Sequence, residues 1–111
     1  MLNYSDIGES LRAIADPTRG MIVDQLCRGP ATVSELAAPF ALTFAAVVQH
    51  IQVLEHAGIV VSQKVGRVRT CRLEPKGLAP LAKWIEQRRT MVERQLDRLA
   101  AYLNEEDAKD T

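Results

Sequence analysis

The chain has 111 residues, of which 47% are hydrophobic and 25% charged, and this composition fits a single globular domain rather than a disordered segment. Its 14 Lys and Arg residues balance 14 Asp and Glu residues, which excludes a uniformly basic, histone-like protein. No apolar run approaches the roughly 20 residues that span a bilayer, no signal-peptide pattern opens the chain, and two cysteines build no disulfide framework. These features predict a cytoplasmic protein.

The N-terminal part is predicted to form two helices with a short break between them. Apolar residues at helical spacing predict a first helix over residues 5–15, with Ser5 as its cap. Asp16 is a good cap for a second helix, and Pro17 suits the first turn, where its missing N–H costs nothing. Gly29-Pro30 ends this helix. Its apolar face consists of Met21, Ile22 and Leu26.

Residues 32–57 are predicted to form a helix-turn-helix. Thr32 and Glu35 have the spacing of a capping box, which starts a short helix that stops near Pro39. Thr43 can cap a second helix that runs to about Ala57. Its inward stripe is expected to be Phe44, Val47, Ile51 and Leu54, and Gly58 is expected to end it in the left-handed conformation.

Residues 59–73 are predicted to form a β-hairpin, because β-branched residues alternate on either side of Gly66-Arg67. Glu74-Pro75-Lys76-Gly77 is expected to close it. Residues 59–76 hold five Lys or Arg residues against the single acid Glu74. They therefore predict either a solvated strand pair or a phosphate-binding wing, in which Arg67 and Arg69 are the expected ligands. Arg72 is expected instead to pair with Glu74.

A long final helix is predicted over residues 78–104, with Pro80 in its first turn. Its apolar positions approach a heptad seam and comprise Leu78, Leu81, Ile85, Val92, Leu96, Leu99 and Leu103. One small domain cannot easily cover a stripe of this length. The seam therefore favours a two-fold dimer that shares the first and last helices of both chains, and the alternative is that it packs on the first helix of its own chain.

The whole order is that of a mainly α winged helix-turn-helix, here expected as one domain over residues 1–111. The second helix of the pair would enter a major groove, and the wing would reach flanking phosphates. Gln49 is placed to bind adenine or a phosphate, and His50 is either a base or phosphate donor or a histidine at the edge of the core. Thr43 is first a cap and second a phosphate ligand. Ala45 and Ala46 permit close approach to a thymine methyl.

The chain resembles the ArsR family of bacterial winged helix-turn-helix repressors. The resemblance lies in Asp16-Pro17-Thr18-Arg19, in Thr32-Val-Ser-Glu-Leu-Ala37, in Ala46-Val-Val-Gln-His-Ile51 with Val53-Leu-Glu-His-Ala-Gly-Ile-Val60, and in the wing residues Gly66-Arg67 and Arg72-Leu73. It implies a homodimeric repressor that leaves a palindromic operator, often in its own operon, when an effector binds. The sequence departs from the family in having Val48 in place of a frequent Ser, and Cys71 in place of a frequent aromatic residue.

The resemblance also implies which effectors do not fit. Residues 34–38 lack the Cys-x-Cys cluster of metal-sensing members, and residues 78–104 contain no histidine, so no metal or other cofactor is expected. No motif indicates nucleophilic catalysis, and an enzyme is not expected. Two alternatives stay open: a winged helix that binds an acidic protein, and a repressor in which Cys27 and Cys71 form a reversible disulfide, although such thiols are more often small core residues.

Overall fold

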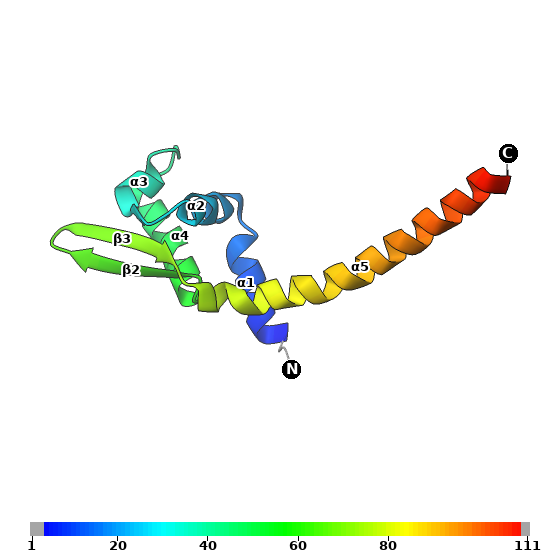
Figure 1. The fold of residues 1–111 in the computed structure, drawn as a ribbon. Coiled ribbons are helices and arrows are strands. Elements are labelled where there is room, and N and C mark those ends of the chain that lie inside the picture. Colours follow the sequence, from blue (N-terminus) through cyan, green and yellow to red (C-terminus); the bar gives the residue numbers. More distant parts are fainter. Residues whose placement is uncertain (1–3, 110–111) are drawn as a thin grey trace. The chain divides into compact units, whose positions relative to one another are not determined.

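A computed structural model describes residues 4–109, and the side chains of residues 7–106. The chain comprises two compact units, residues 1–81 and residues 82–111 (Figure 1). The first contains α1 (Tyr4–Ile14), α2 (Pro17–Cys27), β1 (Ala31–Thr32), α3 (Val33–Ala37), α4 (Phe44–His56), β2 (Val60–Val65) and β3 (Val68–Leu73). α5 (Pro75–Lys109) starts in the first unit and supplies the second. The predicted class, mainly helical with a winged helix-turn-helix, is confirmed.

Three helices start at the caps that the sequence predicts. The Asp16 carboxylate accepts a hydrogen bond of 3.0 Å from the Arg19 amide, and Pro17 follows it in the first turn of α2. The capping box is complete, because the Thr32 hydroxyl accepts from the Glu35 amide and the Glu35 carboxylate accepts from the Thr32 amide, both at 3.1 Å. Thr43 accepts from the Ala46 amide at the start of α4. The cap predicted at the Ser5 side chain lies outside the described side chains.

The predicted hairpin is confirmed, and it belongs to a three-stranded antiparallel sheet in the order β1-β3-β2. Gly66 turns the chain with a φ of 63°, a left-handed value that suits glycine and is typical of the first central residue of a type II′ turn. Strand β1 was not predicted from the sequence. It has two residues, and only its pairing of Ala31 with Cys71 and Thr32 with Thr70 defines it as a strand.

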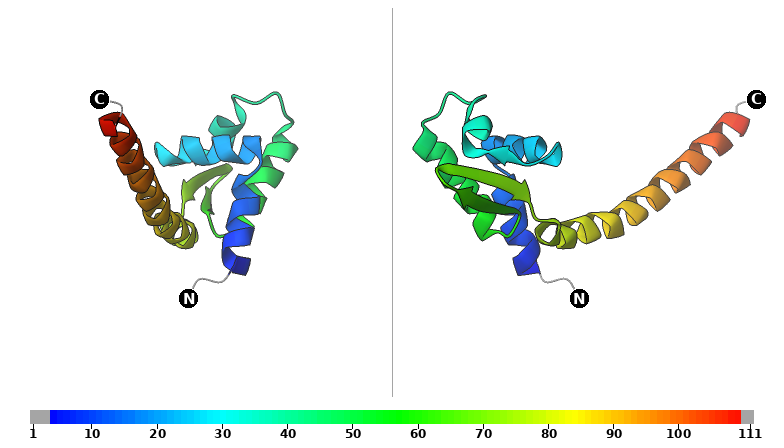
Figure 2. Two further views of the ribbon diagram at one scale, coloured as in Figure 1. Left: turned by 90° about the vertical axis from the view of Figure 1, so that its right-hand side faces the viewer. Right: turned by 60° about the vertical axis from the view of Figure 1, so that its left-hand side comes forward.

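The core of the first unit lies where α2, α3 and α4 meet the sheet (Figure 2). Its fully buried side chains are Ile22, Leu36, Val47, Ile51, Leu54, Ile59 and Cys71. Val47, Ile51 and Leu54 confirm most of the predicted inward stripe of α4. Phe44 does not follow it, since its side chain is 57% exposed. The prediction is wrong there because the buried core residues of α4 begin only at Val47, and Phe44 lies in the first turn, before them.

The start of α5 differs from the prediction. Pro75, Lys76 and Gly77 do not close the hairpin but form the first turn of the helix, and Pro80 lies inside it. Proline is favoured at the first helical position, which Pro75 occupies. The hairpin ends instead where the Glu74 amide donates to the Ile59 carbonyl at 2.7 Å. None of the described helices is both long enough and apolar enough to cross a bilayer.

Candidate nucleic-acid interface

The exposed start of α4 is the first part of the candidate interface. Thr43, Phe44 and Ala45 are exposed there, and Ala46 is half-buried. The Thr43 oxygen accepts the capping hydrogen bond, which leaves its O–H able to donate to a phosphate. No acidic residue lies in this first turn, so the positive end of the helix dipole is not neutralised. The start of α4 is therefore suited to an anionic partner.

The wing supplies the positive charge. Lys64 and Arg69 are directly paired across β2 and β3, and Arg67 follows the turn glycine. All three side chains are exposed. Arg69 donates to the Ser62 hydroxyl at 2.8 Å, which fixes the guanidinium over the hairpin while leaving further N–H groups for a ligand. The expected surface pair of Arg72 and Glu74 is confirmed at 3.5 Å.

A groove joins these two parts. It has a volume of about 330 Å³ and lies between the start of α3, the start of α4 and the hairpin. Its lining residues are Thr32, Val33, Ser34, Phe44, Val48, Lys64, Arg67, Val68 and Arg69. The groove therefore places the apolar start of α4 beside the three cations of the wing. Sequence reasoning did not select Phe44 for this surface, because helical periodicity assigns it to the core.

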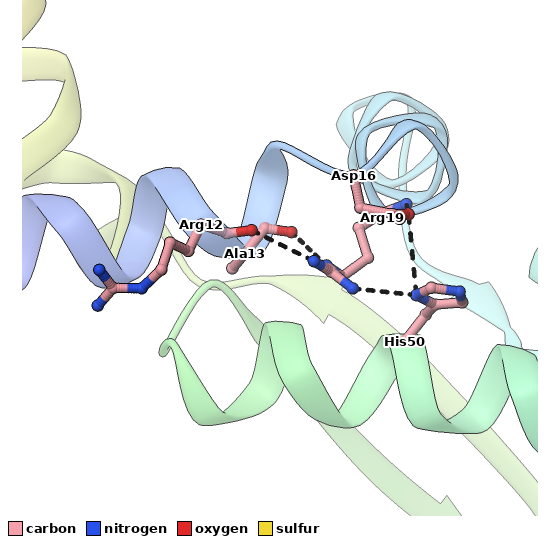
Figure 3. Close-up of polar contacts among 5 residues, drawn as sticks. All are labelled: Arg12, Ala13, Asp16, Arg19 and His50. Carbon is pink, nitrogen blue, oxygen red and sulfur yellow. Dashed lines mark hydrogen bonds and ion pairs between the residues drawn. The ribbon is translucent and has the colours of Figure 1, made fainter.

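His50 lies on the side of α4 that faces α2 (Figure 3). Its Nδ1 is 3.2 Å from a terminal nitrogen of Arg19 and 3.8 Å from the Asp16 carboxylate, and its side chain is 24% exposed. Because a guanidinium can only donate, Nδ1 accepts this hydrogen bond and the ring proton is on Nε2. This geometry favours the alternative of a histidine at the edge of the core, and contact of His50 with DNA stays a prediction.

Arg19 connects three helices, and this role was missed from the sequence. Its Nε donates to the Ala13 carbonyl at 2.6 Å, its Nη2 donates to the Arg12 carbonyl at 3.2 Å, and its Nη1 reaches His50. The end of α1, the start of α2 and the middle of α4 are thereby joined. The motif Asp16-Pro17-Thr18-Arg19 marked only a helix start, since no local pattern shows where a long side chain finds a distant partner.

Gln49 lies on a different face of α4 from Phe44. It lines a second groove of about 610 Å³, together with Gln52, Val53 and His56 of the same helix and residues of α1 and α2. The predicted residues thus occupy two faces of α4 rather than one patch. Among the described residues, no three His, Cys, Asp or Glu side chains are grouped so as to hold a metal ion.

Comparisons with known proteins point in the same direction as this geometry. Residues 16–62 match the family described as "Bacterial regulatory protein, arsR family". The chain is 40% identical over 81 residues to the HTH-type transcriptional regulator Rv2034 of Mycobacterium tuberculosis, which covers 73% of this chain and 76% of that protein.

Two solved structures share the fold. An ArsR family transcriptional regulator, RHA00566, superposes with a TM-score of 0.74 at 37% identity over 82% of this chain and 94% of its own. A winged helix-turn-helix fragment from Mycobacterium bovis, described as homodimeric, has a TM-score of 0.63 at 19% identity and covers 86% of this chain and 85% of its own. The second likeness is one of fold alone.

Proposed function

Because this chain belongs to the arsR family of bacterial regulatory proteins, which are DNA-binding transcriptional regulators, we propose that it acts as a homodimeric repressor of its own operon. The dimer would bind a palindromic operator in the cytoplasm and leave it when an effector binds. The observation that carries the proposal is that the start of α4 and the wing residues Lys64, Arg67 and Arg69 line the same groove.

The charge distribution supports DNA as the partner. α4 carries no Lys or Arg, so its exposed face offers neutral side chains to base edges. The cations lie on the neighbouring hairpin, where they can reach the DNA phosphates on either side of the major groove into which α4 would insert. This division between a neutral reading surface and a cationic anchoring surface is expected of a protein that recognises a sequence in a duplex.

The second unit supports a dimer. Along α5, the predicted seam residues Ile85, Val92, Leu96, Leu99 and Leu103 are each more than half exposed in the single chain. A continuous apolar stripe of this kind is stabilised when a second copy covers it, and two-fold dimers use the same surface on both subunits. Two recognition helices in such a dimer would read half-sites about one helical turn apart.

The test is binding to DNA from the protein's own upstream promoter, measured by fluorescence anisotropy over a salt series and located by footprinting. We expect one protected palindromic site, and an affinity that falls steeply as salt rises, because phosphate contacts release counterions. A protein-interaction module would bind an acidic partner and protect no DNA site. Absence of any protected promoter site, with weak binding that ignores sequence, would overturn the proposed function.

The wing arginines can be tested in the same assay. Arg67→Ala combined with Arg69→Ala should weaken binding to specific and scrambled duplexes alike and lower the salt slope by about two per chain, since phosphate contacts carry no sequence information. The matched control is Arg28→Ala combined with Arg94→Ala, which removes the same charge from exposed positions that are not part of the hairpin. If both pairs lose equal affinity, net charge rather than the wing is responsible.

A further inference from the structure

Phe44 occupies an unusual position for an aromatic residue. It is the first residue of α4, directly after the Thr43 cap, and its side chain is 57% exposed. The N-terminal residues of a recognition helix are those that contact base edges in helix-turn-helix proteins. If α4 enters a major groove, the exposed phenyl ring at this position would therefore lie against the edge of a base pair.

The surroundings of Phe44 favour contact with DNA over contact with a protein core. The ring lines the same groove as Lys64, Arg67 and Arg69. Half-buried Val48, one turn later on α4, lines it as well and provides an apolar surface next to the ring. The neighbouring Ala45 carries no side chain that would keep a base away. A ligand that suits this groove therefore offers both negative charge and an apolar group.

Duplex DNA meets both requirements through phosphates and through the C5-methyl group of thymine, which projects into the major groove. We propose that Phe44 is a specificity-determining residue that reads thymine by contact of its ring with this methyl group. The proposal rests on the proposed function and goes beyond it, since it names the base that the start of α4 prefers. The phenyl ring of Phe44 forms no hydrogen bond with a base. Cytosine, which lacks the methyl group, is therefore disfavoured only because the contact between ring and methyl group is lost.

The experiment separates the methyl group from every other property of thymine. A duplex that binds the wild-type protein is first selected from a random library, and each thymine is then replaced singly by deoxyuridine, which keeps base pairing and lacks the methyl group. Wild-type affinity should fall about fourfold at one thymine in each half-site, the value expected for one buried methyl group. Phe44→Ala should bind more weakly and show no loss at that position.

Val53→Ala is the matched control, because Val53 is also an exposed apolar residue of α4 but lines the other groove. This variant should keep the full deoxyuridine effect. Thermal melts should show that both variants fold, as expected for exposed side chains. If the protein selects a duplex and either ignores every deoxyuridine or keeps its sensitivity in Phe44→Ala, the inference is wrong while the proposed function stands. If no duplex is selected, both are overturned.

Discussion

At the scale of single residues, Asp16 combines two tasks. Its carboxylate caps α2 and lies near Arg19 and His50, the residues that join α2 to α1 and α4. The hydrogen bond from the Arg19 amide lowers the pKa of the Asp16 carboxyl below its ordinary value of 3.8, and the charge of Arg19 acts in the same direction. The charged form is therefore the one that the folded state favours.

This shift predicts how Asp16 affects stability as pH changes. A carboxyl whose pKa is lowered by folding contributes its full stabilisation when the pH is above the ordinary pKa. This contribution disappears as the pH falls through the lower pKa of the folded state. Asp16→Ala should therefore melt at a lower temperature than wild type at pH 7, and the two melting curves should converge at acidic pH. Asp16→Asn, which also caps a helix, should melt closer to wild type at pH 7. A gap between wild type and Asp16→Ala that persists below the pKa would contradict this role.

The two cysteines differ sharply, which bears on the thiol-switch hypothesis. Cys71 is fully buried in β3, whereas Cys27 is exposed at the end of α2. Burial raises the pKa of the Cys71 thiol, and the nearby charge of Glu55 raises it further. Because the thiolate is the reactive form, Cys71 is expected to be inert while the protein is folded. This argues against a reversible disulfide between the two thiols.

Labelling with a thiol reagent at pH 8 checks this expectation. Native protein should release one equivalent of chromophore, from Cys27, and the second only after denaturation. Cys27→Ser should then show no labelling until it unfolds, and Cys71→Ser should label as fast as wild type. Two equivalents at similar rates in the native state would restore the redox hypothesis.

At the scale of elements, the start of α5 depends on a close approach between two backbones. A Cβ built on Gly77 would overlap the carbonyl oxygen of Gly58 and lie 2.9 Å from the amide nitrogen of Ile59. Gly58 follows the C-cap of α4 with a φ of 76°, a left-handed value that suits glycine. Glycine at position 77 is therefore what allows α5 to begin directly against the corner between α4 and β2.

Two glycine-to-alanine changes test this packing against each other. Gly77→Ala should lower the free energy of unfolding by roughly 1–3 kcal/mol, the usual cost of overpacking, in a denaturant titration. Gly20→Ala should instead be neutral or raise it by about 0.5–1 kcal/mol, because a helical glycine costs more backbone entropy than alanine and the new Cβ would lie 3.6 Å from its nearest neighbour. Equal changes in the free energy of unfolding for the two variants would mean that the backbone at Gly58 shifts to accept the new Cβ without loss of stability.

At the scale of the whole molecule, the proposed dimer depends on the second unit. Its apolar stripe is exposed in the single chain, and Ala101 lies on the opposite side of the same helix. A dimer held by the stripe gains affinity for a palindrome because the second half-site is bound within the same complex, an effect of roughly 10²-fold or more.

Leu99→Glu should break this dimer, since it buries an unpaired charge at the seam. Light scattering should then report a particle of 12.3 kDa where wild type gives about twice that mass, and the operator affinity should fall by roughly 10²-fold. Ala101→Glu introduces the same charge outside the stripe and should leave both values unchanged. A wild-type protein that is monomeric at micromolar concentration would overturn the dimer.

Local signals in the sequence determined much of this protein. The caps at Asp16, Thr32 and Thr43 start α2, α3 and α4 as predicted, and Gly66 turns the hairpin, because caps and tight turns depend on residues within a few positions of each other. The cationic wing could be predicted for the same reason. These elements and their order were enough to indicate the winged helix-turn-helix.

The tertiary structure alone decided which side chains of α4 the core covers. Helical periodicity places Phe44 and Val47 on the same face of α4. Only the packing of the unit shows that Phe44 stays exposed while Val47 is buried. The orientation of His50 toward Arg19, the pairing of β1 and the contact of Gly77 with Gly58 likewise join residues that are distant in the chain. The helical repeat determines on which face of a helix a side chain lies. Whether another element covers that face depends on how the whole unit packs.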